Sequence, residues 1–180
     1  MFLRILKIVA ATGFWCVVVS ALWVLLLRFV PPPVTWIMVQ SSNTYTDMEG
    51  KELPFQRDWT PLSRISRAMP QAVIASEDQR FFHHFGFEWK AIERAMDYNE
   101  RKKGKRVKGA STITQQTAKN VFCWPGRTFV RKGIEAWFTL LMESLWSKER
   151  ILEVYLNVAE TGRNTFGVEA ISNSCFHRPA

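Results

Sequence analysis

Residues 77–86 read Glu77-Asp78-Gln79-Arg80-Phe81-Phe82-His83-His84-Phe85-Gly86, which places two adjacent carboxylates inside an apolar, aromatic run. We expect one helix that begins at Pro70 and ends at Gly86. Four residues would share a stripe along it: Met69, Val73, Glu77 and Phe81. Glu77 would then lie among apolar side chains, and since burial disfavours the charged form of a carboxylate, it is a candidate general base. The alternative is that both carboxylates lie in water at the rim of the helix, because structural ion pairs also use such residues.

A membrane-spanning helix is expected near the N-terminus. The uncharged residues 8–27 separate Lys7 from Arg28, and at ~1.5 Å per residue they span the ~30 Å hydrocarbon core of a bilayer. This apolar run is longer than that of a secretory signal and has no small-residue cleavage site, which favours an uncleaved anchor over residues 8–30. More positive charge precedes the span than follows it, so residues 1–7 are expected in the cytoplasm and the bulk of the chain outside.

The remaining length suffices for one domain with its own core. Three consecutive prolines, Pro31-Pro32-Pro33, disfavour helix continuation and make a short stiff spacer. We therefore assign residues 31–45 to a spacer and membrane-proximal segment, and residues 46–180 to the domain. The three cysteines have the spacing of neither a disulfide framework nor a metal site.

The formal net charge is +8, and part of it is local. Six cations fall within residues 101–108: Arg101, Lys102, Lys103, Lys105, Arg106 and Lys108. Such a run can attract nucleic acid, but the neighbouring span makes anionic membrane lipids the nearer partner, and we expect no nucleic acid. The alternative is a solvated loop without a specific role.

Residues 109–120 predict a helix start that favours anions. Thr112 followed by Gln115 fits a capping box, so a helix is expected to begin here with free amide groups beside a glycine and hydroxyls. Three side chains would share one face of it: Gln116, Lys119 and Asn120. Two amides and an ammonium group suit phosphate oxygens and sugar hydroxyls. A polar solvent face is the alternative.

A longer helix is expected to open within residues 127–135 and to run to about Trp146. Its core stripe would consist of five residues: Ile134, Trp137, Phe138, Leu141 and Leu145. Arg131 and Lys132 precede Glu135 by four and three residues, so they are its neighbours on the helix surface. Taken alone, this is an ordinary intrahelical pair that contributes ~0.3 to 0.5 kcal/mol.

The last clear pattern is an amphipathic helix over residues 148–157, interpreted mainly as scaffold. Gly162 is placed to end it. Its expected buried residues are Ile151, Leu152, Tyr155, Leu156 and Ala159.

Together, these four segments resemble the peptidoglycan glycosyltransferases of the lysozyme-like family, which also occur as a domain of class A penicillin-binding proteins. The family patterns are Glu-Asp-x-x-Phe-x-x-His-x-Gly, Gly-x-Ser-Thr-Ile-x-Gln-Gln-x-x-Lys-Asn, Arg-Lys-x-x-Glu and Lys-x-x-Ile-Leu-Glu-x-Tyr-Leu-Asn-x-x-x-x-Gly. Every fixed position is present, from Glu77 to Gly162. With an anchor and no room for a penicillin-binding domain, the chain is similar to the monofunctional, biosynthetic type.

The resemblance implies a mainly α-helical, lysozyme-like glycosyltransferase domain behind one transmembrane helix. A smaller apolar region would dip into the bilayer, and residues 36–39 are candidates for it. The implied location is the bacterial inner membrane, single-pass, with the catalytic domain on the periplasmic side. The implied reaction polymerises lipid II: the 4-hydroxyl of the acceptor's N-acetylglucosamine attacks the anomeric carbon of the donor's N-acetylmuramic acid, and undecaprenyl diphosphate leaves. Inversion at that carbon gives a β-1,4 link.

The resemblance also implies roles for individual residues. Glu77 matches the general base, with Asp78 as its structural partner. Glu135 matches a second catalytic position, a glutamate that orients the reacting groups. The implied substrate-binding residues are Ser111, Gln115, Gln116, Lys119, Asn120, Arg127, Arg131 and Lys132, of which Lys119 and Arg127 would hold the donor's diphosphate. Further motif positions would be structural: Phe81, His84, Gly86 and Asn157.

The C-terminal end departs from the family. A fifth pattern should begin at Gly167, but Cys175 stands where tyrosine is usual and Arg178 where lysine is. The chain then stops before the terminal helices expected of a complete domain, so we interpret it as C-terminally truncated. The apolar stripes of the helices that end near Trp146 and Gly162 would then be left bare.

Two other functions remain open. A lysozyme-like head with a buried glutamate suits a membrane-anchored enzyme that cleaves glycan, although cations suited to diphosphate argue against it. A non-catalytic remnant that binds lipid II or wall-synthesis proteins is the other. The expected partners are lipid II, the growing lipid-linked glycan, membrane lipids and other cell-wall synthesis or division proteins. No cofactor is required; a divalent cation, Mg²⁺ or Mn²⁺, could help neutralise the diphosphate, but the sequence shows no dedicated metal cage.

Overall fold

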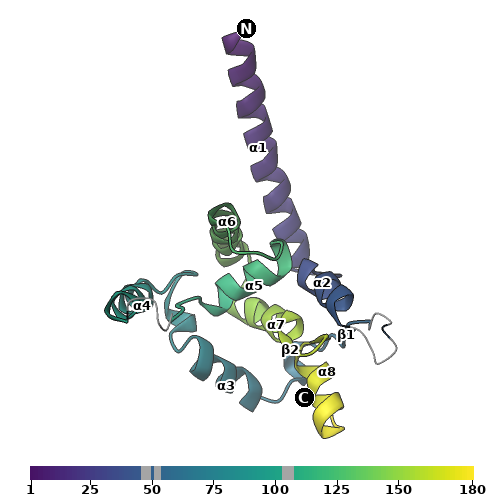
Figure 1. Cartoon of the computed structure of the whole chain (residues 1–180). Coiled ribbons are helices and arrows are strands. Elements are labelled where there is room, and N and C mark those ends of the chain that lie inside the picture. The colour runs from purple at the N-terminus through teal and green to yellow at the C-terminus, as the bar shows by residue number, and fades with distance from the viewer. Residues whose placement is uncertain (46–49, 51–53, 103–107) are drawn as a thin grey trace.

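The structure is a computed structural model that describes residues 1–45, 50, 54–102 and 108–180, and it is mainly helical, as expected (Figure 1). Eight α-helices lie in the described part of the chain: α1 (Phe2–Leu27), α2 (Trp36–Thr44), α3 (Ala68–Glu77), α4 (Trp89–Arg101), α5 (Ile113–Phe122), α6 (Phe129–Leu145), α7 (Lys148–Val158) and α8 (Val168–Phe176). Two 3₁₀ turns and three short strands join them: η1 (Leu62–Arg64), η2 (Phe81–His83), β1 (Gln56–Arg57), β2 (Glu160–Gly162) and β3 (Thr165–Phe166).

α1 is long and apolar enough to cross a membrane, with 26 residues and a mean hydropathy of 2.2 in its most apolar window. It contains the whole expected span, residues 8–27. Only 6% of that window is buried against protein, and in Figure 1 the helix rises away from the remaining elements. α1 could therefore be a membrane anchor, and the other elements form what we call the head.

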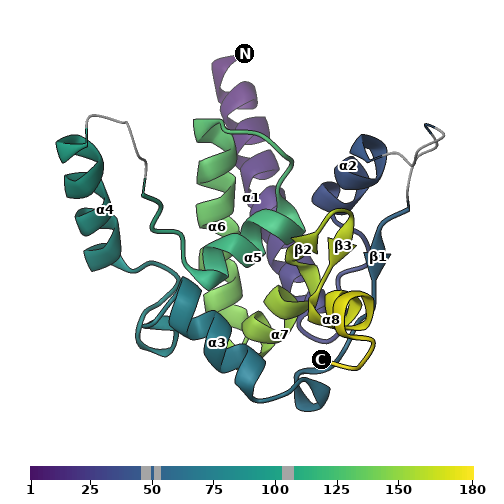
Figure 2. The same ribbon diagram turned by 60° about the horizontal axis from the view of Figure 1, so that its bottom comes forward.

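α5 lies at the centre of the head. It packs against α6 and α7, and Figure 2 shows it crossing α6 with α7 below it. The largest fully buried side chains around this centre come from segments far apart in sequence: Phe81, Ile113, Met142, Ile151, Leu156 and Phe166. A small sheet in the order β1-β3-β2 lies to one side of the helices and pairs β1 in parallel with β3, so the segment after the spacer is tied to the C-terminal part of the chain.

The expected helix over residues 70–86 is wrong in its second half. α3 ends at Glu77, because Asp78 leaves the helical conformation with φ −158° and ψ 75°. Phe81 then lies in the separate turn η2 and does not extend the stripe of α3, although it is fully buried in the core. Glu77 is exposed, so the expectation that it lies among apolar side chains is also wrong.

The expected core stripe of α6 is only half-buried. The most buried residues of this helix are Glu135, Thr139 and Met142, since this face packs against α5, whereas Ile134, Phe138, Leu141 and Leu145 flank it. Trp137 is exposed to solvent or lipid over 37% of its surface. The pattern of apolar residues missed this face because two of its members are polar: the Thr139 hydroxyl donates to the backbone carbonyl of Glu135 at 2.7 Å, and the Glu135 carboxylate pairs with cations of the same helix.

α7 ends earlier than expected and is more deeply buried. It ends at Val158 with Ala159 as its cap, and Gly162 closes β2 instead of ending the helix. Ala159 is half-buried, while Val154, Asn157 and Val158 join the expected buried residues. The expectation that the stripe of this helix is left bare is therefore wrong, because β2, β3 and α8 follow it and α8 packs against it.

The spacer and the membrane-proximal segment are also structured in part. Residues 31–35 have no regular structure, and Thr35 then caps α2 by accepting a hydrogen bond from the amide of Met38. In α2, Met38 is fully buried, whereas Trp36 and Val39 are exposed. Within the expected basic run, Arg101, Lys102 and Lys108 are exposed; the other three cations, Lys103, Lys105 and Arg106, lie outside the described residues.

Candidate functional site

The start of α5 is fixed by the capping box that the sequence predicts. The Thr112 hydroxyl accepts from the amide of Gln115 at 3.2 Å, and the Gln115 side chain accepts from the amide of Thr112 at 3.1 Å. The same hydroxyl donates to the carbonyl of Gly86 at 2.7 Å. Gly86 has φ +76°, and a Cβ there would lie 2.6 Å from Cγ2 of Thr139 in α6. Only glycine fits this position, which explains why the motif ends with it.

Asp78 links the end of α3 to the start of α5. It is buried to 4% exposure, and its carboxylate accepts a hydrogen bond from the amide of Ile113 at 3.1 Å. It also pairs with Nε2 of His84 at 2.9 Å. These contacts join two segments of the chain, which supports a structural role for both Asp78 and His84. They also explain why α3 stops at Glu77, since Asp78 must turn inward to make them.

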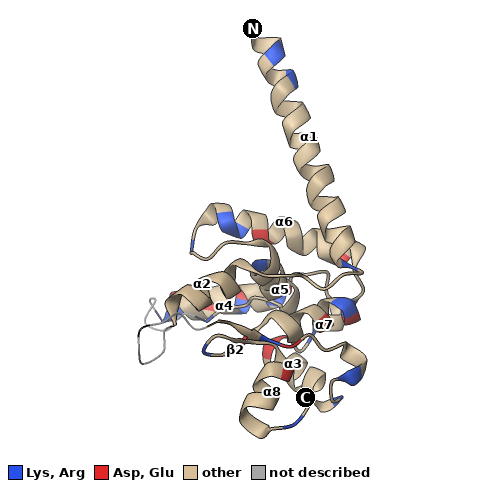
Figure 3. Ribbon diagram, turned by 90° about the vertical axis from the view of Figure 1, so that its right-hand side faces the viewer, with Lys and Arg blue, Asp and Glu red and all other residues tan. Residues whose placement is uncertain are grey.

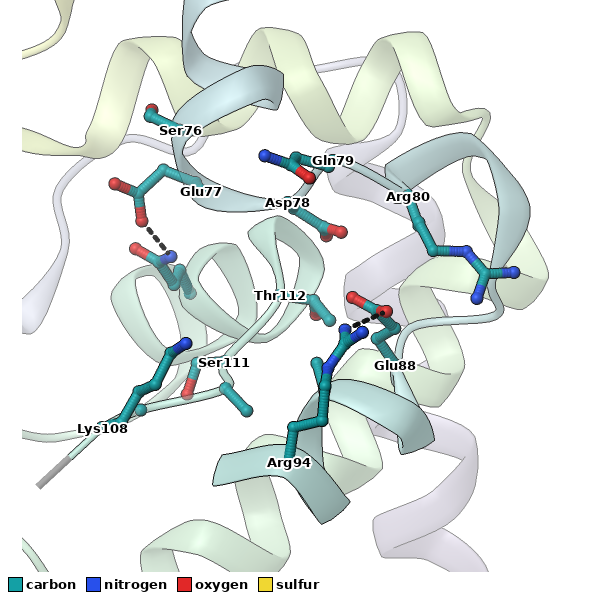
Figure 4. A pocket seen from close by; sticks show the side chains of 14 residues that line it. Ser76, Glu77, Asp78, Gln79, Arg80, Glu88, Arg94, Lys108, Ser111 and Thr112 are labelled. Atoms are coloured by element: carbon teal, nitrogen blue, oxygen red, sulfur yellow. Dashed lines mark hydrogen bonds and ion pairs between the residues drawn. The ribbon is translucent and has the colours of Figure 1, made fainter. Parts of the chain in front are cut away.

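Glu77 lies at the edge of an open cleft of about 590 Å³. Its carboxylate accepts a hydrogen bond from the side-chain amide of Gln116 at 2.9 Å. Figure 4 shows the Glu77 and Asp78 side chains pointing in different directions, with one oxygen of Glu77 in the marked hydrogen bond and the other directed away from it. A carboxylate oxygen that is exposed in a cleft, while its partner oxygen is held, can accept a proton from a bound hydroxyl.

Tyr155 of α7 contacts the side chain of Gln116, the residue that holds Glu77. Its hydroxyl donates to the side-chain oxygen of Gln116 at 3.5 Å. Burial, and then the negative charge of Glu77, raise the pKa of Tyr155 to about 12, so the phenol keeps its proton. A donor on the oxygen side of the Gln116 amide favours the orientation in which the amide nitrogen faces Glu77.

The opposite wall of the cleft carries mixed charge. Arg94 of α4 pairs with Glu88 at 3.2 Å, as Figure 4 shows, and Lys108 and Ser111 lie along the same cleft. Such a wall offers hydrogen-bond donors of the kind that bind sugar hydroxyls and acyl groups. Ser111 is one of the expected substrate-binding residues; the others just named were not expected.

A second pocket, of about 410 Å³, gathers three cations. It is lined by Lys119, Arg127 and Arg131 together with Ile37, Gln40, Trp124, Pro125 and Gly126. Lys119 lies three residues after Gln116, so the same face of α5 serves both the Glu77 cleft and this pocket. Three positive charges beside apolar surface can hold an anionic group that carries a lipid chain.

Glu135 holds two cations from within the helix. It is buried to 3% exposure, and its carboxylate pairs with Nη1 of Arg131 at 2.7 Å and with Nζ of Lys132. Both of its oxygens are therefore occupied, so its effect on a ligand would pass through Arg131, which lines the cationic pocket. Burial, followed by the charge of Glu135, also raises the pKa of the neighbouring Cys123 to about 11.

Other expected site residues lie outside these two pockets. Gln115 is buried and occupied by the capping box, and it borders a separate surface pocket with Lys132. Asn120 is buried and lines none of the pockets described above. Asn157 has a structural role, because its side chain exchanges two hydrogen bonds with the backbone of Thr60, at 2.7 and 2.9 Å.

The donor set of the cleft does not resemble a metal cage. Within the described residues, no group of three or more His, Cys, Asp or Glu side chains is placed to hold a metal ion. The carboxylates along the cleft are each engaged by a protein donor: Glu77 by Gln116, Asp78 by His84 and Ile113, Glu88 by Arg94. A divalent cation at a bound diphosphate stays a prediction.

Sequence patterns missed several residues of the site. Tyr155 was expected only as a buried scaffold residue, Lys108 only as a member of the basic run, and Arg94 and Glu88 were not singled out. Nothing in their local sequence separates them from an ordinary buried aromatic or solvated charges. Only the folding of α4 and α7 against α5 brings them to the cleft.

Comparison with known proteins agrees with the resemblance seen in the sequence. A family model described as "Transglycosylase" matches residues 44–180. A biosynthetic peptidoglycan transglycosylase of Bdellovibrio bacteriovorus is 56% identical over 88% of this chain and 62% of its own length. Proteins with the same name are 49% identical over 96% of the chain in Pseudomonas putida (strain W619) and 52% identical over 87% in Pasteurella multocida. The chain spans 72% and 63% of the length of those two relatives.

Proposed function

Because the chain belongs to the transglycosylase family, we propose that it is a membrane-anchored peptidoglycan glycosyltransferase that polymerises lipid II into β-1,4-linked glycan. The observation that carries this proposal is the position of α5 between two unlike pockets. Gln116 contacts Glu77 in an open polar cleft, and Lys119, one turn later, lines a pocket with Arg127 and Arg131.

This layout matches the needs of an inverting displacement. Gln116, which holds Glu77, and Lys119 lie one helical turn apart on the same face of α5, so that the carboxylate and the cations lie on adjacent parts of one surface. A base on one side and cations on the other are therefore what a single substitution at an anomeric carbon requires. An enzyme that only cleaves glycan by hydrolysis meets no diphosphate and has no need of the three cations.

In the proposed reaction, the 4-hydroxyl of the acceptor's N-acetylglucosamine lies against the free oxygen of Glu77. Its oxygen forms a bond to the anomeric carbon of the donor's N-acetylmuramic acid while Glu77 takes the proton. The bond from that carbon to the diphosphate oxygen breaks, and its electron pair leaves with undecaprenyl diphosphate. Lys119 and Arg127 would stabilise the developing negative charge of the leaving group.

Residues behind the two pockets would keep these groups in position. Gln116 holds one oxygen of Glu77 and leaves the other free, and Glu135 keeps Arg131 at the cationic pocket. We propose that Glu135 acts in this way, as the residue that orients the cations and not as a second base. Ser111 would bind the acceptor sugar, since it lines the cleft that contains Glu77.

The proposed location is the bacterial inner membrane, with α1 as a single-pass anchor and the head on the periplasmic side. The proposed partners are lipid II, the growing lipid-linked glycan, the surrounding lipids and other proteins of wall synthesis or division. Figure 3 supports this orientation in one respect, because basic residues lie at the free end of α1, where the cytoplasmic leaflet would be.

The test is to incubate the detergent-purified chain with labelled lipid II and to separate the products by size. Polymer that disappears on digestion with a muramidase supports the proposal. Shortened fragments from preformed glycan, without polymer, would instead identify a cleaving enzyme. Saturable binding of lipid II without any product would identify a non-catalytic binding protein, and either of these two results overturns the proposal.

A further inference from the structure

The head holds the last turn of α1 directly. Val24 and Leu27 are buried to 0% and 2% exposure, although most of the helix is not covered by protein. Nε1 of Trp146, just after α6, donates to the carbonyl of Val24 at 2.8 Å. Nη2 of Arg150 in α7 donates to the carbonyl of Leu27 at 2.8 Å. Two side chains of the head therefore bind backbone groups of α1.

A reciprocal contact joins α1 to α6. Nη1 of Arg28, which follows α1, donates at 2.9 Å to the carbonyl of Leu145, the last residue of α6. Further along the two helices, Nε1 of Trp137 donates to the hydroxyl of Ser20 at 3.1 Å. The end of α1 thus accepts a hydrogen bond from Arg150 of the head, and the end of α6 accepts one from Arg28. Together with the contact at Ser20, the interface extends over about two turns of α1.

These hydrogen bonds are favourable because of where they form. The carbonyl of Leu27, the last of α1, is one of the helix-end carbonyls that have no partner within the helix and carry the negative end of its dipole, whereas the carbonyl of Val24 also accepts from the amide of Arg28 at 3.1 Å. Near the bilayer, less water is present to satisfy them, so a guanidinium group is a strong substitute. Arg150 is itself held in place: its guanidinium lies 5.4 and 5.9 Å from the rings of Trp59 and Trp146 and pairs with Glu153.

The spacer after α1 is fastened as well. Arg150 also donates to the carbonyl of Val30 at 2.9 Å, and Nη1 of Arg57 donates to the carbonyl of Pro33. The proline segment is therefore bound at both ends to the head. A stiff spacer alone would let the head swing as a unit about the end of α1, and these contacts oppose that motion.

We infer that α1 is docked on the head as one rigid unit, with Trp146 and Arg150 as the residues that fix its angle. Because α1 packs on α6 and α6 packs on α5, this angle also sets the height of the Glu77 cleft and of the cationic pocket above the membrane. Trp146 and Arg150 are thus positioning residues that act through α1, at a distance from the reacting groups. Only the link to activity rests on the proposed function.

The chain supplies its own pair of probe sites. Cys16 in α1 and Cys175 in α8 are exposed, whereas Cys123 is buried. Spin labels on Cys16 and Cys175 of the full chain in lipid nanodiscs would report the distance between anchor and head. We expect a single narrow distance distribution for the wild-type chain. We expect this peak to be lost in Arg150→Gln and to broaden in Trp146→Phe, which keeps the aromatic packing but removes the hydrogen bond to Val24.

Arg4→Gln is the matched control, since it removes an arginine in the first turn of α1, at the end of the helix opposite to the residues that contact the head. It should leave the narrow distribution unchanged. A broad distribution already in the wild-type chain, or one that stays narrow in both variants, would overturn the inference. If Arg150→Gln does not fold, as judged by its melting curve, the Trp146→Phe result decides.

An activity measurement separates positioning from folding. Trp146→Phe should lose activity several-fold on full-length lipid II in bilayers and lose little on a short-chain analogue dissolved in detergent. Equal losses on both substrates would mean that Trp146 supports the fold only, and would overturn the positioning role. Should the chain prove inactive on both substrates, the proposed function fails while the distance distributions still decide the inference.

Discussion

Glu77 and Asp78 are adjacent in the chain, but their carboxylates lie in opposite environments. Glu77 is exposed at the open cleft and contacts Gln116, whereas Asp78 is buried and contacts His84 and the amide of Ile113. The end of α3 between them causes this separation, because the chain turns inward at Asp78. When each residue is replaced by its amide, we therefore expect the Glu77 variant to lose turnover and the Asp78 variant to lose stability.

Replacing Glu77 with Gln should abolish polymerisation and leave the melting temperature and the binding of lipid II nearly unchanged. The amide keeps the shape of the side chain but cannot accept the proton, so turnover should fall by ~10²-fold or more. Turnover is measured with labelled lipid II, and Glu100→Gln, an exposed residue at the end of α4, is the control. Turnover close to that of the wild-type chain would remove Glu77 from the mechanism.

Replacing Asp78 with Asn should lower stability. The variant weakens two charge-assisted hydrogen bonds in a buried site, which should cost ~1.5 to 3 kcal/mol. For a chain of this size, each kcal/mol corresponds to about 2 to 4 °C in the melting temperature. Thermal unfolding followed by circular dichroism measures the change, and an unchanged melting temperature would contradict the structural role of Asp78.

Replacing Tyr155 with Phe should reduce turnover less than replacing Gln116 with Leu, and the two effects should not add. Both variants act on the same chain of hydrogen bonds to Glu77, in which Tyr155 contacts only Gln116. Non-additive losses are expected for residues that share one network. The double variant is compared with each single one in the lipid II assay, and fully additive losses would argue against the network.

Lys119→Ala and Arg127→Ala should each weaken binding of a diphosphate-bearing lipid more than binding of a diphosphate-free glycan. Each variant removes a charge-assisted contact of ~1.5 to 3 kcal/mol at a desolvated diphosphate. The two affinities are measured side by side, with Arg178→Ala, an exposed cation of the C-terminal segment, as the control. Equal losses for both ligands would show that these residues do not contact phosphate.

Stability should decline at alkaline pH, in two overlapping ranges. Burial raises the pKa of Cys123 from 9.0 to about 11 and that of Tyr155 from 10.0 to about 12. Between each pair of values the unfolded chain has lost a proton that the folded chain keeps, so stability is complete below pH 9 and falls as pH rises. The loss is up to about 1.4 kcal/mol per group and pH unit.

Urea unfolding at a series of pH values measures this decline. Cys123→Ala should remove the part between pH 9 and 11, and Tyr155→Phe the part between pH 10 and 12. Glu77→Gln should lower the pKa of Tyr155, because it removes the nearby negative charge. An identical decline in stability in the wild-type chain, in Cys123→Ala and in Tyr155→Phe would show that other groups cause it.

Local patterns succeeded where neighbours in sequence make the structure. The capping box at Thr112 and the pairing of Arg131 and Lys132 with Glu135 need only the geometry of one helix, and both are present. The prediction of one helix over residues 70–86 was wrong because the contacts of Asp78 with distant segments end the helix early. The predicted core stripe of α6 was wrong for the same reason, since packing against α5 determines which face is buried, and that face includes polar residues.

The sequence by itself determined the apolar helix, the order of the motifs and the family, because each depends on residue types at fixed spacings along the chain. Only the tertiary structure decided which of the two carboxylates faces the cleft, that Tyr155 reaches Gln116, and that Trp146 and Arg150 hold the end of α1. These relationships join residues as much as 123 positions apart. They arise when packing of the core brings such residues together, and the helical or strand periodicity of a local segment does not predict them.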